Sequence, residues 1–187
     1  MLMPAFRRQW TVDDLQDLPD DGQRYEVIDG ELFVTPAPSY DHQAAIAALY
    51  RRLAEYLDRE RVGCVLFAPA DVAFSPVRLV QPDVFVVPLA SGHRPRSFDD
   101  VKRLLLAAEV LSPSTARHDR VRKRALYRDE GVPEFWIVDL DARTFERSTP
   151  ADSRVDVLDE RVEWMPHGAS TPFVIDVAAY FAEVLDA

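Results

Sequence analysis

The chain has 187 residues, of which 48% are hydrophobic and 29% charged, and its formal net charge at pH 7 is -10. This length suffices for one self-sufficient core and is small for two, so we expect a single domain over residues 1–187. The acidic balance argues against a protein that coats nucleic acid through bulk electrostatics. It does not exclude a nuclease, because metal ions and a local basic face can offset phosphate charge.

The chain has a single cysteine, Cys64, within the apolar stretch Val62–Phe67. A single cysteine forbids an intrachain disulfide and is typical of a reducing compartment. Residues 1–10 carry Arg7 and Arg8 without the apolar core of a signal peptide. No apolar run approaches the roughly 18 residues of a membrane span. We therefore expect a cytoplasmic protein with no membrane segment.

Two helix starts are visible in the first third of the chain. Thr11 and Asp14 have the spacing of a capping box, so a short helix should follow them. A longer helix should begin near Ser39 or Asp41, with His42 in its first turn. For a lone histidine there, a cap or a packed side chain is the commoner role. The apolar stripe of this helix is Ile46, Leu49, Tyr50, Leu53 and Leu57.

A β-hairpin is predicted between these two helices. Asp29-Gly30 separates two β-rich runs within Arg24–Val34, which is the strongest short-range hairpin signal. Glu26 and Glu31 lie on either side of the turn. Solvated hairpin charges are the favoured interpretation for both.

Two acidic residues stand in apolar runs in the middle of the chain. Asp83 opens the run Val84–Val87, and Glu109 lies near the end of the run Leu104–Leu111. Both runs read as buried strands, where an isolated ionised carboxylate is costly without a partner. A divalent cation is one such partner, and two carboxylates beside a cationic side chain are typical of phosphodiester chemistry. A structural ion pair is the alternative for either carboxylate taken alone.

A helix is predicted over roughly Ala116–Glu130, ending at Gly131. Asp119, Lys123 and Tyr127 follow one another at intervals of four and share one face, so Lys123 can point back at the strand ends. The residues interpreted as caps or solvated cations are Ser114, Thr115, Arg120, Arg122 and Arg124.

The remaining elements are predicted from weaker patterns. Gly63 to Phe74 reads as one strand, and Ser91–Asp100 as a polar surface loop. Further strands are expected over Glu134–Asp139, Thr144–Arg147, Val155–Met165 and Phe173–Val177, followed by a terminal helix over Val177–Leu185.

Several blocks of this sequence agree in order and spacing with those of a known family. They are Tyr25–Leu32, His42, Gln81–Val84, Glu109–Thr115, Asp119, Lys123, Tyr127 and Gly131–Asp139. In these blocks the chain resembles the Uma-two family of restriction-endonuclease-like proteins, within the PD-(D/E)XK nuclease superfamily. The resemblance spans about Trp10 to Asp139. It implies an α/β (α+β) fold with a restriction-endonuclease-like core over about 10–148. That core would have a mixed central β-sheet flanked by helices and an N-terminal β-hairpin extension, with residues 149–187 packed on it.

The resemblance also implies a magnesium (or manganese) site. Asp83 and Glu109 would hold the ion, with the main-chain carbonyl of Val110 as a further ligand. The superfamily pattern would place a lysine at the position of Leu111. Two accounts of this departure are open: Lys123 has taken over from the neighbouring helix, which is the favoured account, or the site has lost its charged assistant.

The implied activity is metal-dependent phosphodiester hydrolysis, with DNA as the expected substrate and RNA or a nucleotide as alternatives. Glu31 and His42 are further candidates at the rim of the site. Because a DNA cutter has two strands to reach, a weakly held homo-oligomer is expected. The competing class is a catalytically inert nuclease fold that serves as an interaction or regulatory protein. The net charge of -10 and the apolar Leu111 favour that class.

Overall fold

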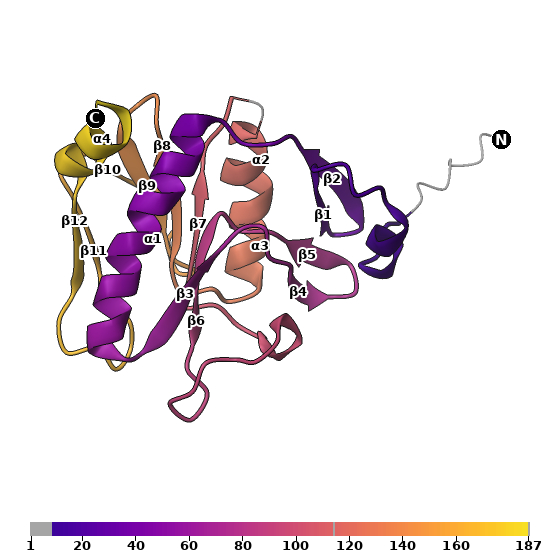
Figure 1. Cartoon of the computed structure of the whole chain (residues 1–187), viewed down its shortest axis with the longest axis horizontal. Coiled ribbons are helices and arrows are strands. Elements are labelled where there is room, and N and C mark those ends of the chain that lie inside the picture. The colour runs from indigo at the N-terminus through magenta and orange to yellow at the C-terminus, as the bar shows by residue number, and fades with distance from the viewer. Residues whose placement is uncertain (1–8, 114, 187) are drawn as a thin grey trace.

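The computed structural model describes residues 9–113 and 115–186. Its centre is a six-stranded sheet with the order β10-β9-β8-β7-β6-β3 (Figure 1). β7 and β8 pair in parallel, whereas the other neighbours pair antiparallel, so the predicted mixed central sheet is confirmed. The strands are β3 (Gly63–Phe67), β6 (Val84–Pro88), β7 (Leu106–Val110), β8 (Phe135–Asp139), β9 (Thr144–Ser148) and β10 (Asp156–Leu158).

The middle strands of this sheet are covered on both faces. β7 is buried at every residue, and β6 and β8 are buried at all but their last. Strands covered on both faces read as continuous apolar runs without polar alternation. The acidic residues at the ends of these strands therefore lie beside the buried apolar core.

A second, four-stranded sheet has the order β2-β1-β5-β4. The predicted hairpin is confirmed, because β1 and β2 pair antiparallel across Asp29 and Gly30. These two residues have φ angles of 51° and 77°, the left-handed pair that a tight type I′ hairpin turn requires. The strands are β1 (Arg24–Ile28), β2 (Glu31–Thr35), β4 (Val72–Ser75) and β5 (Arg78–Val80).

The segment Gly63–Phe74, predicted as one strand, is instead divided between the two sheets. β3 belongs to the central sheet and β4 to the small one. Pro69 lies between them, and a proline has no N–H with which to continue a strand ladder. The chain therefore leaves the central sheet after Phe67 and enters the small sheet at Val72.

The predicted helices are confirmed, with one irregularity. α1 (Tyr40–Glu60) begins after Ser39, whose side chain accepts a hydrogen bond from the backbone N–H of His42. The second helix consists of α2 (Ala116–His118), a π turn (Asp119–Lys123) and α3 (Arg124–Asp129). The predicted cap Ser114 lies outside the described residues. The other elements are 3₁₀ helices Asp13–Asp17 and Phe98–Asp100, strands β11 (Arg161–Trp164) and β12 (Phe173–Asp176), and helix α4 (Val177–Leu185).

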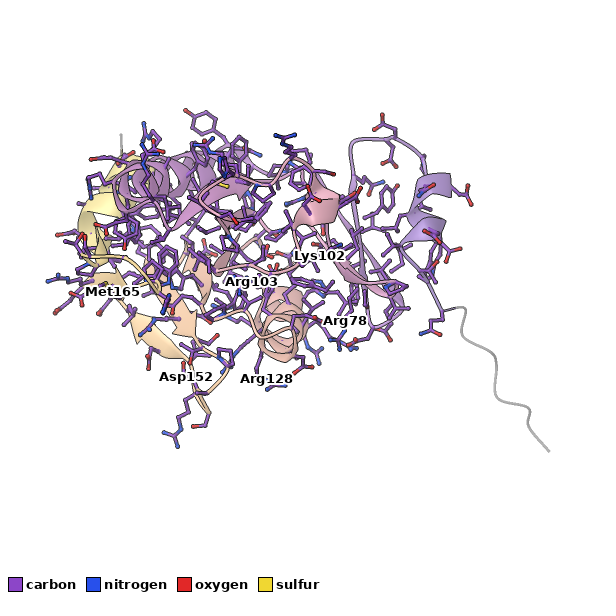
Figure 2. All side chains as sticks on the ribbon, turned by 90° about the horizontal axis from the view of Figure 1, so that it is seen from below. Arg78, Lys102, Arg103, Arg128, Asp152 and Met165 are labelled. Carbon is purple, nitrogen blue, oxygen red and sulfur yellow. The ribbon has the colours of Figure 1, made fainter. Side chains whose placement is uncertain are left out.

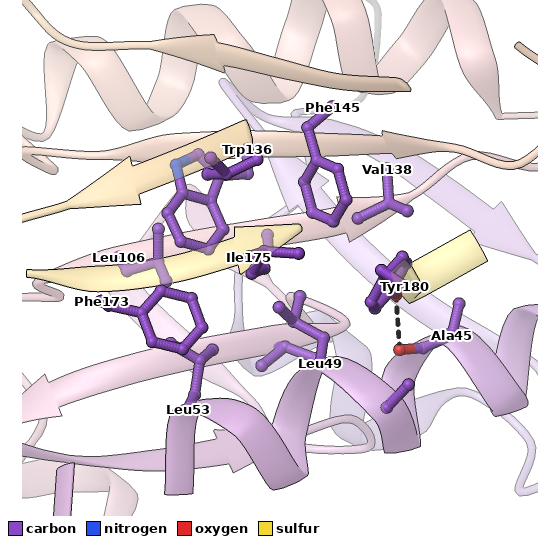
Figure 3. Packing of buried hydrophobic residues seen from close by; sticks show 14 of the residues in the cluster. Ala45, Leu49, Leu53, Leu106, Trp136, Val138, Phe145, Phe173, Ile175 and Tyr180 are labelled. Atoms are coloured by element: carbon purple, nitrogen blue, oxygen red, sulfur yellow. Dashed lines mark hydrogen bonds between the residues drawn. The ribbon is translucent and has the colours of Figure 1, made fainter. Parts of the chain in front are cut away.

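The two faces of the central sheet carry separate layers. α1, α4 and the β11–β12 pair lie on one side, and the second helix and the small sheet lie on the other (Figure 1). On the α1 side, Leu53, Trp136 and Phe145 pack in one apolar cluster, and Tyr180 donates a hydrogen bond to the carbonyl of Ala45 at 2.8 Å (Figure 3).

Ion pairs join the small sheet to the end of α3. Arg78 of β5 lies beside the C-terminal end of that helix, near Arg128 (Figure 2). Its guanidinium donates to Asp29 and to Glu130, each at 2.6 Å. The position of the hairpin relative to the second helix is thus fixed by charge as well as by apolar packing. Among residues 9–113 and 115–186, no helix has the length and apolar character that a membrane span requires.

Candidate active site

A cleft of about 760 Å³ opens where β7 and β8 end and α1 begins. The carboxyl ends of parallel strands meet at one edge of a sheet, and the loops that leave them form natural crevices there. The residues of the cleft floor that carry charge or can carry it are Arg24, His42, Asp83, Glu109, Asp119 and Lys123.

Asp83 lies directly before β6 and is 2% exposed. Its Oδ1 accepts a hydrogen bond from Arg24 Nη1 at 2.6 Å, and its Oδ2 accepts one from the N–H of Val110 at 2.9 Å. Oδ2 also lies 3.2 Å from His42 Nε2. Burial alone would raise the pKa of Asp83, but the hydrogen bond and charge of His42 and the charge of Arg24 outweigh burial and lower the pKa to about 2. Asp83 is therefore ionised at neutral pH.

Glu109, in β7, faces the helix that follows that strand. Its Oε1 lies 3.0 Å from Lys123 Nζ and accepts a hydrogen bond from Tyr127 Oη at 2.8 Å. Burial raises the pKa of Glu109 well above its ordinary value; Lys123 opposes this shift, and the charge of Asp83 adds to it. The side chain of Lys123 points back to the strand ends, as the helix spacing predicted.

Lys123 remains an ammonium although it is 5% exposed. Burial would lower its pKa, but the neighbouring charges of Glu109 and Glu26 outweigh burial and raise the pKa above its ordinary value. Lys123 is therefore a fixed cation and hydrogen-bond donor at the cleft floor.

Glu26 in β1 is 1% exposed, so the prediction of a solvated hairpin charge is wrong for this residue. Its Oε1 lies 3.0 Å from Lys123 Nζ and accepts the N–H of Gln81 at 2.6 Å. Its Oε2 is buried and has no hydrogen-bond partner among the described residues. The error has a tertiary cause, because the small sheet packs one face against the second helix and buries side chains that a free hairpin would expose.

Arg24 is a site residue that the sequence pattern did not single out. It stands two positions before Glu26 in β1, so both side chains leave the same face of the strand. The alternation of side chains along a strand was the local signal that could have placed Arg24 beside Glu26. Its partner Asp83 lies 59 residues away in the chain, and no local pattern predicts that distance.

Of the remaining predicted residues, some line the cleft and one does not. His42 lines the cleft and contacts Asp83. Glu31 is not among the lining residues, and its Oε2 lies 3.3 Å from Arg122 Nη2. Leu111 lines the cleft as an apolar side chain, and the ammonium beside Glu109 belongs to Lys123.

Asp119 reaches the site from an irregular part of the second helix. It is 3% exposed, and its Oδ1 lies 3.8 Å from Lys123 Nζ. The π turn from Asp119 to Lys123 is closed by the N–H of Arg124, which donates to the carbonyl of Asp119. Burial raises the pKa of Asp119, which Lys123 opposes. Single π turns inside α-helices are rare and occur often at functional sites.

The charges at the cleft floor do not balance. Four carboxyl groups meet two permanent cations there: Asp83, Glu109 and Asp119 line the cleft with Arg24 and Lys123, and Glu26 contacts Lys123 from the hairpin. A divalent cation would offset this excess, and carboxylate oxygens are the donors that Mg²⁺ and Mn²⁺ prefer. The buried Oε2 of Glu26 also accepts no hydrogen bond within the part of the chain that the structure describes.

A ready-made cage of ligands is nevertheless absent from residues 9–113 and 115–186, where no cluster of three or more His, Cys, Asp and Glu side chains is arranged to hold a metal ion. Lys123 and Arg24 lie between the acids instead. Mg²⁺ commonly uses one or two carboxylates and keeps several waters, so Asp83 and Glu109 fit that ion without a third protein ligand.

Two arginines stand at the mouth of the cleft. Arg120 Nη2 donates to Asp139 at 2.6 Å, and Arg143 Nη2 donates to Asp186 at 2.8 Å. Both are at least one-third exposed. Arg120 is thus held by two largely buried carboxylates, Asp139 and Glu146, and Arg143 by the half-exposed Asp186.

The comparisons with known proteins concern both sequence and fold. A sequence model of the Uma2 family, described as "Putative restriction endonuclease", matches residues 12–174. No functionally curated protein matches the chain. The chain is similar to a crystal structure of "a putative nuclease belonging to DUF820" from Anabaena variabilis ATCC 29413, with a TM-score of 0.76, 19% identity, and coverage of 94% of this chain and 99% of that chain. This likeness confirms the fold class. Because the family match covers most of its length, the chain belongs to the Uma2 family, the Uma-two family that its motifs resemble.

Proposed function

We propose that the protein is a metal-dependent nuclease that hydrolyses phosphodiester bonds, with DNA as its substrate. The observation that carries the proposal is a pair of buried carboxylates, Asp83 and Glu109, beside the buried ammonium of Lys123 at the floor of an open cleft. Buried ion pairs of this kind contribute little net stability, so catalysis accounts for the cluster better than folding does.

Asp83 and Glu109 would hold Mg²⁺ or Mn²⁺. When bound, such an ion supplies a water of lowered pKa and neutralises charge on the phosphate. His42 and the N–H of Val110 orient Asp83, and Tyr127 orients Glu109. These contacts fix both carboxylates before substrate arrives, which is the preorganisation that catalysis requires.

Lys123 would serve as the assisting cation. Its raised pKa keeps it protonated at neutral pH, so it acts as a charge and a donor and not as a general base. It would orient the attacking water or stabilise the negative charge that develops on the phosphate oxygens.

The cleft volume of about 760 Å³ bears on the substrate. This volume holds part of a nucleic-acid strand and not a whole duplex, so the rest of the substrate would run past the mouth. Arg120 and Arg143 lie there, and their exposed guanidinium groups would contact the phosphates. Contacts to phosphate do not distinguish DNA from RNA, so the choice of DNA is tested by direct competition between the two.

The test is isothermal titration of Mn²⁺ into the wild type and the variants Asp83→Asn and Glu109→Gln. Each substitution removes the charge of a ligand and keeps its shape. Glu183→Gln is the matched control, because Glu183 is a carboxylate about one-third exposed that pairs with Arg51 and Arg52 and does not line the cleft. We expect the wild type and the control to bind Mn²⁺ and both cleft variants to lose binding. Binding that survives both cleft substitutions would exclude this site.

Cleavage assays then test which nucleic acid is the substrate. Plasmid DNA, a DNA duplex and an RNA of the same sequence are incubated with the wild type and Mg²⁺, beside Lys123→Ala. We expect the wild type to cleave DNA. The cleavage rate of Lys123→Ala should be lower by roughly 100-fold or more, as for the loss of other groups that stabilise transition-state charge.

A second candidate function is an inert nuclease fold that binds a partner. The observation in its favour is that both oxygens of Asp83 are already engaged, while Leu111 replaces the lysine of the superfamily pattern. This candidate requires that the wild type bind neither Mn²⁺ nor Mg²⁺ and leave all three substrates intact.

A further inference from the structure

We infer that Arg24 is a phosphate-binding residue that holds one oxygen of Asp83 until substrate and cation arrive, and thereby couples their binding. The inference rests on the proposed function, in which Asp83 is a ligand of the cation. Arg24 lies in the hairpin strand β1, outside the central sheet and the second helix that carry Glu109 and Lys123.

Both oxygens of Asp83 have partners, but the partners differ in how easily they can leave. Oδ2 is held by the N–H of Val110, inside the central sheet, and by His42, which is 4% exposed. Oδ1 is held by Arg24, whose side chain is 17% exposed and lines the cleft. A cation that binds Asp83 competes with these donors for the oxygen lone pairs, and the guanidinium is the donor with room to move.

Like charges add to this competition. A divalent cation and a guanidinium on one carboxylate repel each other at short range, and the repulsion is large at a buried site. Arg24 therefore weakens binding of a cation to Asp83 as long as no other anion takes the guanidinium away from that carboxylate.

A phosphodiester in the cleft would be that other anion. Arg24 Nε is buried and has no hydrogen-bond partner among the described residues, so the guanidinium has an unused donor beside the one given to Asp83. The planar fork of an arginine matches two phosphate oxygens, which a single contact to Asp83 does not satisfy. If Arg24 moved from Asp83 to a phosphate, Oδ1 of Asp83 would become free to bind the cation. The guanidinium would then pair with the phosphate in place of the carboxylate.

This exchange makes the two ligands cooperative. Phosphate takes Arg24 away from Asp83 and so favours the cation, and by linkage the cation must favour phosphate by the same factor. Coupling of this kind typically amounts to about 5- to 150-fold in affinity.

The experiment measures Mn²⁺ affinity by calorimetry, with and without a short phosphorothioate DNA duplex that resists cleavage. Without DNA, Arg24→Gln should bind Mn²⁺ more tightly than the wild type, by about fivefold or more. With DNA, the affinity of the wild type should rise, whereas that of Arg24→Gln should change little. Arg24→Lys keeps the charge without the fork, and it should retain weak binding of Mn²⁺ while losing most of the gain from DNA.

The matched control is Arg78→Gln in the same small sheet. Arg78 is 24% exposed, is paired with three carboxylates and is not among the residues that line the cleft. It should bind Mn²⁺ like the wild type in both titrations. If both Arg24 variants, folded by circular dichroism, bind Mn²⁺ as the wild type does or more weakly, Arg24 is only structural and the inference is wrong, while the proposed function stands. If the wild type binds no Mn²⁺ under either condition, the proposed function and this inference fail together.

Discussion

At the scale of single residues, Lys123 supplies the positive charge that offsets the buried carboxylates around it. Its Nζ lies 3.0 Å from Glu26 Oε1 and 3.0 Å from Glu109 Oε1, and all three side chains are buried. Removing one partner of a buried ion pair leaves a charge that neither water nor a counterion offsets. Because carboxylates outnumber cations here, the metal-free protein should lose stability when the ammonium is removed and should tolerate the loss of one carboxylate.

We predict that Lys123→Met lowers the free energy of unfolding by about 3–5 kcal/mol in metal-free buffer. Glu109→Gln should leave it unchanged or raise it, because this substitution removes one of the excess negative charges and keeps an oxygen for Tyr127. Urea unfolding followed by circular dichroism measures both. Arg59→Met, at an exposed pair with Glu55, is the control and should change stability by less than about 1 kcal/mol.

A loss of stability in Glu109→Gln comparable with that in Lys123→Met would contradict this account. It would mean that the cluster is held together by its charges and carries no excess of them.

At the scale of elements, the end of α1 is fastened to the loop between β11 and β12. Glu60, the last residue of α1, accepts hydrogen bonds from the N–H of Ser170 at 2.5 Å and the hydroxyl of Thr171 at 2.6 Å. The hydrogen bond from Thr171 and then those from Ser170 lower the pKa of Glu60 to about 2. A loop 110 residues away is thus tied to the helix by one carboxylate.

This contact predicts a pH dependence with a definite sign. The folded pKa of Glu60 is depressed, so its contribution to stability is complete above the unfolded pKa and is lost as the pH falls towards the folded value. The difference in unfolding free energy between the wild type and Glu60→Gln should be constant from pH 7 to about pH 5 and should shrink from there towards about pH 2. Urea unfolding at a series of pH values measures it, and a difference that grows towards acid would contradict the prediction.

At the scale of the whole molecule, the C-terminal helix is joined to the N-terminal half of the chain. Tyr180 of α4 is fully buried and donates its hydroxyl to the carbonyl of Ala45 in α1 (Figure 3). Its ring also packs against Phe145 of the central sheet, with centroids 5.1 Å apart. The last helix therefore completes the layer on one face of the sheet, and its last residue, Leu185, also lines the cleft.

We predict that Tyr180→Phe costs about 1–3 kcal/mol of stability, because the carbonyl of Ala45 loses a buried donor while the packing of the ring is kept. Affinity for Mn²⁺ should equal that of the wild type, since the substitution lies away from the cleft. Thermal unfolding and calorimetry measure the two effects, and a parallel loss of Mn²⁺ binding would show that α4 helps to shape the site.

The sequence sufficed for those elements whose signals are local. The hairpin turn at Asp29-Gly30 and the terminal helix Val177–Leu185 were predicted with their bounds, because turn residues and apolar spacing act over a few positions. Asp83, Glu109 and Lys123 were placed together through the order of motifs. Arg24 and the burial of Glu26 were not predicted, because they depend on which face of the hairpin the second helix covers, and that is settled only by packing.

The π turn has a consequence for the phase of the second helix. A helix advances by about 100° per residue, and a π turn holds one residue more than the α-helical turn it replaces. Deleting exposed Val121 would let the segment wind as a plain α-helix and would keep Asp119 in its present phase relative to α3, whereas winding all five residues of the turn as α-helix would rotate Asp119 by about 100° relative to α3. The extra residue therefore sets the direction in which Asp119 points: the loss of one exposed residue would leave that direction unchanged, and conversion of the turn to α-helix at constant length would turn the carboxylate away.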